Sequence, residues 1–333
     1  MVWNILLVAL SFPLLLGGAV LFTNSVEWLG ARLGLGHGPI GSVLAAVATA
    51  LPESVIPVIA ILTGETGGQI AIGAIIGAPF LLGTLGMAVV GLSALGFRGR
   101  RAQGTALRLD RGSTRRDLAV FVPMLGTALF LGLVGGTTVH VVVAVALVLA
   151  YVAYAWRTLD RGGEASGEDE LRRLYFNPRG HEAPRTGWIW LQVLVGVGLI
   201  VGGAQVFVSE IEQLAAAAGL PALVLALVLA PLATELPEKL NSVLWVRQSK
   251  DALALGNITG AMVFQAAVPI AVGLAFVEWD LGPPAVIAGA CGLAGALLCM
   301  AVTWRGPRFP AAAVAAWLAL YLGAVGYVLA AGT

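Results

Sequence analysis

The sequence predicts an all-α membrane protein of about ten transmembrane helices, arranged as two inverted-topology repeats of five helices each. Three observations support this fold class: a scarcity of charge, a regular succession of long apolar segments, and an internal repeat. Hydrophobic residues make up 59% of the 333 residues and charged residues 11%, and the mean hydropathy is +0.92. A soluble domain carries about 25% charged residues, because water covers its surface. Most of the surface of this chain is therefore expected to face lipid.

The successive apolar segments are long enough to cross a bilayer. About 20 apolar residues in a helix cross the ~30 Å of hydrocarbon, and abundant glycine suits close helix packing in lipid. The first segment, Trp3 to Phe22, has no basic residue before it and no suitable small-residue cleavage site, which favours a retained helix over a removed signal peptide. The ten predicted spans cover residues 2–24, 39–62, 69–95, 117–135, 138–157, 187–214, 220–246, 251–276, 283–303 and 309–330.

The basic residues segregate to one side of these spans. Of the 19 Lys and Arg residues, 18 fall in the loops that follow the first, third, fifth, seventh and ninth spans. Loops rich in Lys and Arg mark the cytoplasmic face of a membrane protein. We therefore expect a multi-pass protein of the cell membrane with both its N- and C-termini on the extracytoplasmic side. The exception is Lys239, which lies inside the seventh span.

The second half of the sequence repeats the first. Residues 22–53 align with residues 207–238 at a constant offset of 185, and residues 73–78 align with residues 256–261 at a slightly different offset. Because each repeat holds five spans, the second copy must enter the membrane upside down, as in the inverted repeats of secondary transporters. The alignment divides the chain into a first repeat (1–157, motifs 48–53 and 73–82), a cytoplasmic linker (158–186) and a second repeat (187–333, motifs 233–238 and 256–265).

The repeat places Glu53 and Glu238 at equivalent positions inside two membrane spans. A carboxylate in hydrocarbon is costly unless it is paired, protonated or bound to an ion. Each glutamate follows a proline that frees a backbone carbonyl, so broken helices are expected at both Leu-Pro-Glu motifs. Freed carbonyls, the hydroxyls of Thr49 and Thr234 and the two carboxylates together make a hard-oxygen cation site. The alternative is a pair of glutamates neutralised by protonation in a packed interior.

Further polar residues surround the second motif. Glu235 lies three residues before Glu238, on nearly the same helix face, and is either another ligand or a proton-carrying group. Lys239 either pairs with an acid inside the bundle or turns to another face, because adjacent helical residues diverge by about 100°. Additional neutral oxygens are available from Asn241, Ser242 and Gln265.

Other classes of chemistry lack support. The sequence has no Gly-rich Walker loop, so ATP is not expected as a partner, and it has no nucleophile motif, so no enzyme is expected. Neither a tightly bound cofactor nor nucleic acid is implied, and Cys291 and Cys299 are expected to be packing residues. The expected partners are the lipid bilayer and transported inorganic cations. The residues leave three functions open: a secondary antiporter, an ion channel or leak pathway, and a non-transporting cation sensor.

The two motifs resemble those of the cation/calcium antiporter superfamily, which includes the sodium/calcium exchangers. That family has two inverted α-repeats, each with a Gly-Thr-Ser-Leu-Pro-Glu type stretch followed by a Gly-Ser-Asn-x-Phe-Asn type stretch. The first stretch here reads Ala48 to Glu53 and Ala233 to Glu238. The resemblance implies the ten-span fold and the exchange of Ca2+ or a related cation for Na+ or H+. It also implies that Glu53 and Glu238 are the central ion-binding residues and that Thr49 and Thr234 are accompanying ligands.

The second stretch departs from the family pattern in both repeats. Ser-Asn is replaced by Ala78-Pro79 in the first repeat and by Ala261-Met262 in the second. The last polar position of the stretch holds Leu82 in the first repeat and Gln265 in the second. A site with fewer neutral oxygens and more carboxyl groups suits proton-coupled exchange better than separate sodium and calcium sites.

Overall fold

The computed structural model describes residues 2–32, 51–134, 137–161, 173–178 and 184–331. Within these ranges the chain is helical, and its single β-type contact is an isolated bridge between Ala106 and Arg308. The elements are α1 (Val2–Arg32), α3 (Leu51–Thr63), α4 (Gly67–Leu81), the π-helix η1 (Leu82–Gly86), α5 (Met87–Gly96), the 3-10 helix η2 (Arg98–Arg100), α6 (Arg111–Val134), α7 (Thr137–Arg161), α8 (Thr186–Ala218), α9 (Ala222–Arg247), α10 (Asp251–Phe276), α11 (Pro283–Arg305) and α12 (Ala311–Ala331).

The helices confirm the predicted all-helical membrane fold. Eight helical segments are long and apolar enough to cross a membrane, and α4, η1 and α5 together form one of them. The helix α9 is also long, but only its first part, Ala222–Glu235, is apolar, because charged residues follow. The helix α3 is described only from Leu51 onward. These ten segments correspond to the ten predicted spans.

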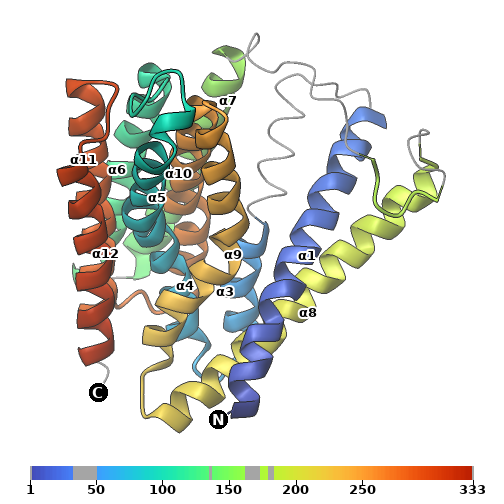
Figure 1. Cartoon of the computed structure of the whole chain (residues 1–333). Coiled ribbons are helices and arrows are strands. Elements are labelled where there is room, and N and C mark those ends of the chain that lie inside the picture. Colours follow the sequence, from blue (N-terminus) through green and yellow to red (C-terminus); the bar gives the residue numbers. More distant parts are fainter. Residues whose placement is uncertain (1, 33–50, 135–136, 162–172, 179–183, 332–333) are drawn as a thin grey trace.

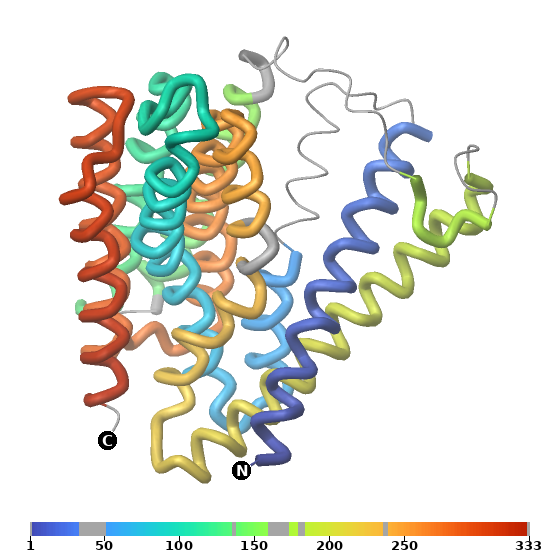
Figure 2. The backbone as a smooth tube through the Cα atoms, viewed as in Figure 1, coloured from blue at the N-terminus to red at the C-terminus, as the bar shows by residue number. Residues whose placement is uncertain are grey.

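The helices α1 and α8 lie against each other as a tilted pair beside the remaining bundle (Figures 1 and 2). Both are longer than expected, with 31 and 33 residues, because a tilted helix needs more residues to cross the same hydrocarbon thickness. They run in opposite directions (Figure 1), as an inverted repeat requires. Both chain termini lie at the same end of the molecule.

The contact between α1 and α8 has the symmetry of the repeat. A Cβ atom added to Gly18 would lie 2.8 Å from Ile200 Cγ1, and one added to Gly203 would lie 3.1 Å from Leu15 Cγ. Gly18 and Gly203 are 185 residues apart, and so are Leu15 and Ile200. Gly18 packs against Ile200, and Gly203 packs against Leu15. The two contacts are therefore the same contact repeated by the symmetry of the two halves. Small residues at such a crossing let two membrane helices approach closely.

The helix α4 occupies the centre of the bundle. In the most apolar stretch of the Gly67–Gly96 span, 83% of the residues are buried inside the protein. In the most apolar stretch of Thr138–Thr158 in α7, 17% of the residues are buried. A Cβ on Gly73 would lie 2.6 Å from the carbonyl oxygen of Leu223, and one on Gly77 would overlap the carbonyl of Leu227. The second motif of the first repeat is therefore pressed against the backbone of α9, the helix that carries the acidic motif of the second repeat.

The expected helix break at the second Leu-Pro-Glu motif does not form. The helix α9 continues through Leu236, Pro237 and Glu238. The φ angle of proline is compatible with a helix, and proline removes only one helical hydrogen bond, here the one to the carbonyl of Ala233. The hydrogen bonds of the neighbouring turns can therefore hold the helix together. At the first motif, residues 48–50 lie outside the described residues, and α3 is helical from Leu51 through Glu53.

An interruption that the sequence did not predict lies directly after the second motif of the first repeat. The π-helix η1 begins at Leu82, three residues after Pro79. Pro79 has no amide hydrogen, so the carbonyl of Ile75 lacks its intrahelical donor. The N–H of Leu82 bonds to the carbonyls of both Ala78 and Pro79, and π-turns of this kind frequently occur at functional sites.

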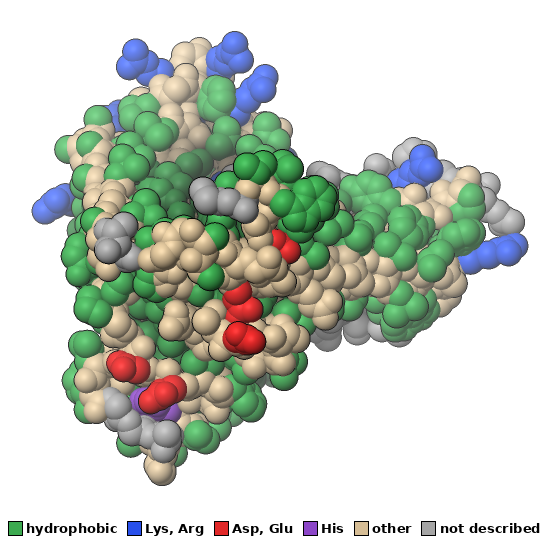
Figure 3. Space-filling view, turned by 90° about the horizontal axis from the view of Figure 1, so that it is seen from below, with side chains coloured by type: hydrophobic (Ala, Val, Ile, Leu, Met, Phe, Trp, Pro, Cys, Tyr) green, Lys and Arg blue, Asp and Glu red, His purple; other side chains and the backbone are tan. Residues whose placement is uncertain are grey.

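Charge separates the two ends of the bundle. The arginine-rich end is formed by residues 98–116, 247–250 and 305–308, and lies opposite the chain termini (Figure 1). The acidic end holds the acids of the opposite loops, and acidic side chains dominate the charged groups on that face (Figure 3). These acids are Glu65, Glu212, Glu278 and Asp280. The carboxylate of Glu212 accepts hydrogen bonds from the backbone N–H of Thr66 at 2.7 Å and from its hydroxyl at 3.0 Å, which joins α8 to the turn before α4.

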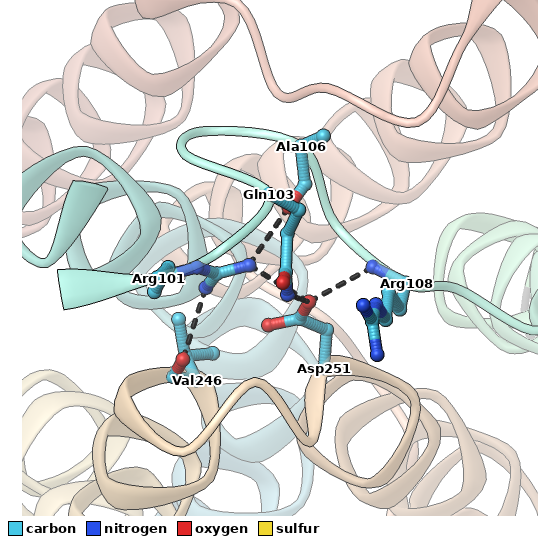
Figure 4. A network of polar contacts seen from close by, with 6 residues as sticks. All are labelled: Arg101, Gln103, Ala106, Arg108, Val246 and Asp251. Carbon is cyan, nitrogen blue, oxygen red and sulfur yellow. Dashed lines mark hydrogen bonds and ion pairs between the residues drawn. The ribbon is translucent and has the colours of Figure 1, made fainter. Parts of the chain in front are cut away.

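A buried ion pair joins the two repeats at the arginine-rich end (Figure 4). Arg101 Nη2 lies 2.8 Å from Asp251 Oδ2, and neither side chain is exposed. The guanidinium also donates to the carbonyl of Val246 at 3.0 Å and to that of Ala106 at 2.8 Å. Arg101 belongs to the loop before α6, whereas Val246 and Asp251 flank the junction of α9 and α10. The loop of the first repeat is thus fastened to that junction.

Asp251 is the centre of this network. Its Oδ2 atom also accepts hydrogen bonds from Gln103 Nε2 at 3.2 Å and from the backbone N–H of Arg108 at 2.8 Å. Asp251 is the first residue of α10, where the helix dipole favours a negative charge. The network therefore fixes the start of the helix that carries the second motif of the second repeat.

Replacing Arg101 with Met is expected to destabilise the protein by about 3–5 kcal/mol, because it leaves the carboxylate of Asp251 buried without its cation. The neighbouring side chain of Arg100 is exposed, so Arg100→Met is the matched control and should change stability little. The unfolding midpoint of the purified protein in detergent measures both effects. The double variant Arg101→Met/Asp251→Leu should lose less than the sum of the two single variants. Equal midpoints for Arg101→Met and Arg100→Met would contradict this role for the pair.

Candidate functional site

The second acidic motif forms an ion pair inside the bundle. Glu235 and Lys239 lie one turn apart on α9, and Lys239 Nζ is 3.0 Å from Glu235 Oε2. The relative exposures are 1% for Glu235 and 7% for Lys239. Of the two orientations expected for Lys239, the structure has the one in which it pairs with an acid. A buried pair of this kind is retained because each charge compensates the other.

Gln265 brings α10 into the same cluster. Its Nε2 atom donates a hydrogen bond to Glu235 Oε1, so both oxygens of this carboxylate have a partner. Gln265 is 2% exposed, and its own Oε1 atom is buried without a hydrogen-bond partner among the described residues. The cluster thus contains an acceptor that no described donor satisfies. An amide oxygen in this position is a suitable ligand for a hard cation.

Lys239 also contacts the first repeat. A Cβ atom added to Gly86 would lie 3.7 Å from Lys239 Cε, which is ordinary van der Waals contact. Gly86 is the last residue of η1, so the lysine side chain lies beside the π-turn that follows the second motif of the first repeat. Three elements therefore meet at the pair of Glu235 and Lys239: α9, α10 and η1.

The remaining predicted ligands occupy different positions. Glu53 lies in the first described turn of α3 and is partly buried, and α3 packs against α4, α8, α9 and α10. Thr234 is buried, and its hydroxyl donates to the carbonyl of Ala230 at 3.2 Å, which leaves the oxygen lone pairs as acceptors. Thr49 and the side chain of Glu238 lie outside the described residues.

The two polar residues after the motif point in different directions. Ser242 is fully buried, whereas Asn241 is exposed. Adjacent helical residues diverge by about 100°, so only one of the two can face the bundle. The structure therefore brings together Glu235, Lys239 and Gln265, and it places Asn241 away from them.

A second buried carboxylate was missed by sequence reasoning. Asp117 of α6 accepts hydrogen bonds from the hydroxyl of Thr259 at 2.7 Å and from the hydroxyl of Tyr154 at 2.8 Å. Asp117 and Thr259 are both buried, and the three residues come from α6, α10 and α7. The available signal was weak: Asp117 is the first residue of the fourth predicted span, and Thr259 lies within the 256–265 motif. The helix α10 therefore carries polar contacts from Asp251 through Thr259 to Gln265.

The acids whose positions the structure describes do not gather into a compact metal centre. Among the described residues, no three His, Cys, Asp or Glu side chains are placed to hold a metal ion together. The oxygen atoms near the motifs come instead from single carboxylates, an amide and a hydroxyl on different helices.

Several solved structures have the same fold. The crystal structure of the H+/Ca2+ exchanger CAX is 18% identical, with a TM-score of 0.73 over 98% of this chain and 82% of the other. The structure of native YfkE is 15% identical, with a TM-score of 0.66 over 97% of this chain and 99% of the other. A structure of the sodium-calcium exchanger NCX_Mj is 20% identical, with a TM-score of 0.58 over 98% of both chains.

The family is established by sequence. A comparison with curated proteins finds no match. The family model described as sodium/calcium exchanger protein matches residues 3–159 and 188–329, which fall in the two halves of the sequence. These two segments hold the repeated helices and both acidic motifs. The chain therefore belongs to the sodium/calcium exchanger family, a family of membrane cation transporters and not of enzymes.

Proposed function

We propose that this protein is a secondary active antiporter that exchanges Ca2+ or a related divalent cation for Na+ or H+ by alternating access around Glu53 and Glu238. The family implies Ca2+ antiport with one of these two counter-ions. The observation that carries the proposal is the buried polar cluster of α9 and α10, set beside the second motif of the first repeat. Charged groups at such positions in a membrane protein mark an ion pathway.

The apolar character of the second motifs favours H+ as the counter-ion. Ala78, Leu82 and Met262 are all buried at or near positions where the resembling family has polar ligands. Neutral oxygens are what a dehydrated Na+ needs when it enters a protein site, whereas a proton needs only a carboxylate. The carboxylates that remain can bind one divalent cation or the protons that replace it.

Alternating access needs two parts that move relative to each other. The helices α1 and α8 form a pair at one side of the bundle (Figure 1). They contact each other through Gly18 and Gly203. We propose that this pair moves as a unit against the bundle and exposes Glu53 and Glu238 to each side in turn. In this motion the two repeats, residues 1–157 and 187–333, take the same parts in turn as the site opens to one side of the membrane and then to the other. The linker 158–186 joins them.

The charge distribution supports an orientation in the cell membrane. The arginine-rich end is expected to face the cytoplasm, which places both termini and the acidic end outside. Transported cations would then meet the exposed acids Glu65, Glu278 and Asp280 at the outer face. Acids at the mouth of a pathway raise the local concentration of cations.

Flux measurements on purified protein in liposomes test the site. Glu53→Gln and Glu238→Gln should each lower Ca2+ uptake driven by a pH or Na+ gradient by about tenfold to 100-fold, because a charge-assisted contact is worth about 1.5–3 kcal/mol. Glu65→Gln, at an exposed acid of the acidic end, is the matched control and should lower uptake far less than either site variant, because Glu278 and Asp280 remain at that end. Full uptake by both site variants would overturn the assignment. Currents far above transporter turnover would favour a channel, and ion binding without flux would favour a sensor.

Cysteine labelling tests the orientation. In a background with Cys291→Ser and Cys299→Ala, a membrane-impermeant maleimide added to intact cells should label Ala217→Cys and not Gln248→Cys. Both positions are exposed, the first at the acidic end and the second at the arginine-rich end. Permeabilised cells, in which both positions should react, provide the control. The reverse pattern would place the termini in the cytoplasm.

A further inference from the structure

We infer that Lys239 is a tethered cation: its ammonium group fills a monovalent-cation position at the carboxylate of Glu235, in the cluster that also contains Gln265, and this position is thereby closed to soluble ions. The inference deepens the proposed function, because it assigns which acids remain for the transported ion. The inference rests on the proposed function only where it assigns acids to the transported ion. The cation position itself is defined by contacts within the structure.

The ammonium group contacts the carboxylate of Glu235 as a bound cation would. Nζ lies 3.0 Å from Glu235 Oε2, and the other oxygen of this carboxylate is held by the amide of Gln265. The amide oxygen of Gln265 is buried and has no hydrogen-bond partner among the described residues. If the lysine were absent, a small cation would find the carboxylate oxygen as a ligand, and the unpartnered amide oxygen of Gln265 is a further acceptor on a residue that contacts the same carboxylate.

The lysine is exceptional in the sequence. It is the one basic residue of 19 that lies well inside a predicted membrane span, since Arg157 is the last residue of its span, and Lys250, the only other lysine, is exposed at the arginine-rich end. A basic side chain inside a membrane bundle is costly and is retained when it has a partner and a role. An ammonium group has the charge of Na+ or K+, but its covalent link to the chain prevents it from being exchanged.

The cation position exists in one repeat alone. The repeat equivalents of Glu235 and Lys239 are Ala50 and Ser54, at the offset of 185 residues. The equivalent of Gln265 is Leu82, at the offset of the second motif. The first repeat thus lacks the acid, the lysine and the amide together, which indicates that the three residues form one unit.

The unit has a consequence for the transported ion. Because Lys239 pairs with Glu235, the proposed function assigns the transported ion to the other two carboxylates of the motifs, Glu53 and Glu238. Their combined charge matches one divalent cation. A wild-type transport cycle should therefore need no additional alkali cation beside the exchanged ions, whereas a protein without the lysine should acquire such a requirement.

The test removes the tether and supplies the cation from solution. Lys239→Met keeps most of the side-chain volume without the charge, and Lys250→Met is the matched control at the other lysine. The unfolding midpoint of each purified full-length protein in detergent is measured in N-methyl-D-glucamine chloride and in ammonium, sodium or potassium chloride of equal ionic strength. Lys239→Met should have a lowered midpoint in N-methyl-D-glucamine and a saturable recovery in at least one small cation, beyond any response of the wild type and of Lys250→Met.

A double variant identifies the position. Glu235→Gln/Lys239→Met removes both charges, so it should fold without the small cation and should not gain the recovery. An equal cation response in Lys239→Met and the wild type would overturn the inference, and so would an equal response in the double variant. Failure to recover folded Lys239→Met in any of the four salts, while the double variant folds, would also overturn it, because no soluble cation then replaces the ammonium group.

Flux separates this inference from the proposed function. In liposomes, Ca2+ uptake by Lys239→Met should be lost in N-methyl-D-glucamine and restored by the cation that restores the midpoint, while wild-type uptake needs no such cation. If Glu53→Gln and Glu238→Gln keep full uptake, the proposed site fails, but the midpoint measurements still decide the role of Lys239.

Discussion

The cost of burying charge in an apolar bundle is the constraint on which the rest of this structure depends. A carboxylate inside hydrocarbon must be paired, hydrogen-bonded or bound to a cation. Asp251 is compensated by Arg101, Asp117 by two hydroxyl groups, and Glu235 by Lys239 and Gln265. Each of these networks includes a partner from another helix or loop, so the charged groups also help to determine how the helices are positioned.

Close helix packing brings these groups together. The glycines of α4 let its backbone approach that of α9, and the glycines of α1 and α8 make a contact with the symmetry of the repeat. The inverted repeat supplies two similar halves, but their chemistry has diverged. The first repeat contributes the π-turn η1 and apolar side chains, whereas the second contributes an acid, a lysine and an amide. This asymmetry suits a site in which one half holds a fixed charge and both halves share the transported ion.

Much of the fold followed from the sequence, because membrane thickness, charge segregation and the repeat act over long stretches of chain. The ten spans and the unusual position of Lys239 were predicted for these reasons. The continuity of α9 through Pro237 was not, because the loss of one donor does not reveal whether neighbouring turns hold the helix. The partners of Glu235 and Asp117 depend on which faces of α9, α6 and α10 meet, and residue spacing within one helix carries no such information.

Equilibrium binding of radioactive Ca2+ to the purified protein tests the central claim most directly, because it counts the ions that the available carboxylates hold. The account predicts one Ca2+ bound per chain in N-methyl-D-glucamine buffer, and loss of this binding in Glu53→Gln. Two or more Ca2+ ions per chain, or undiminished binding in Glu53→Gln, would contradict it.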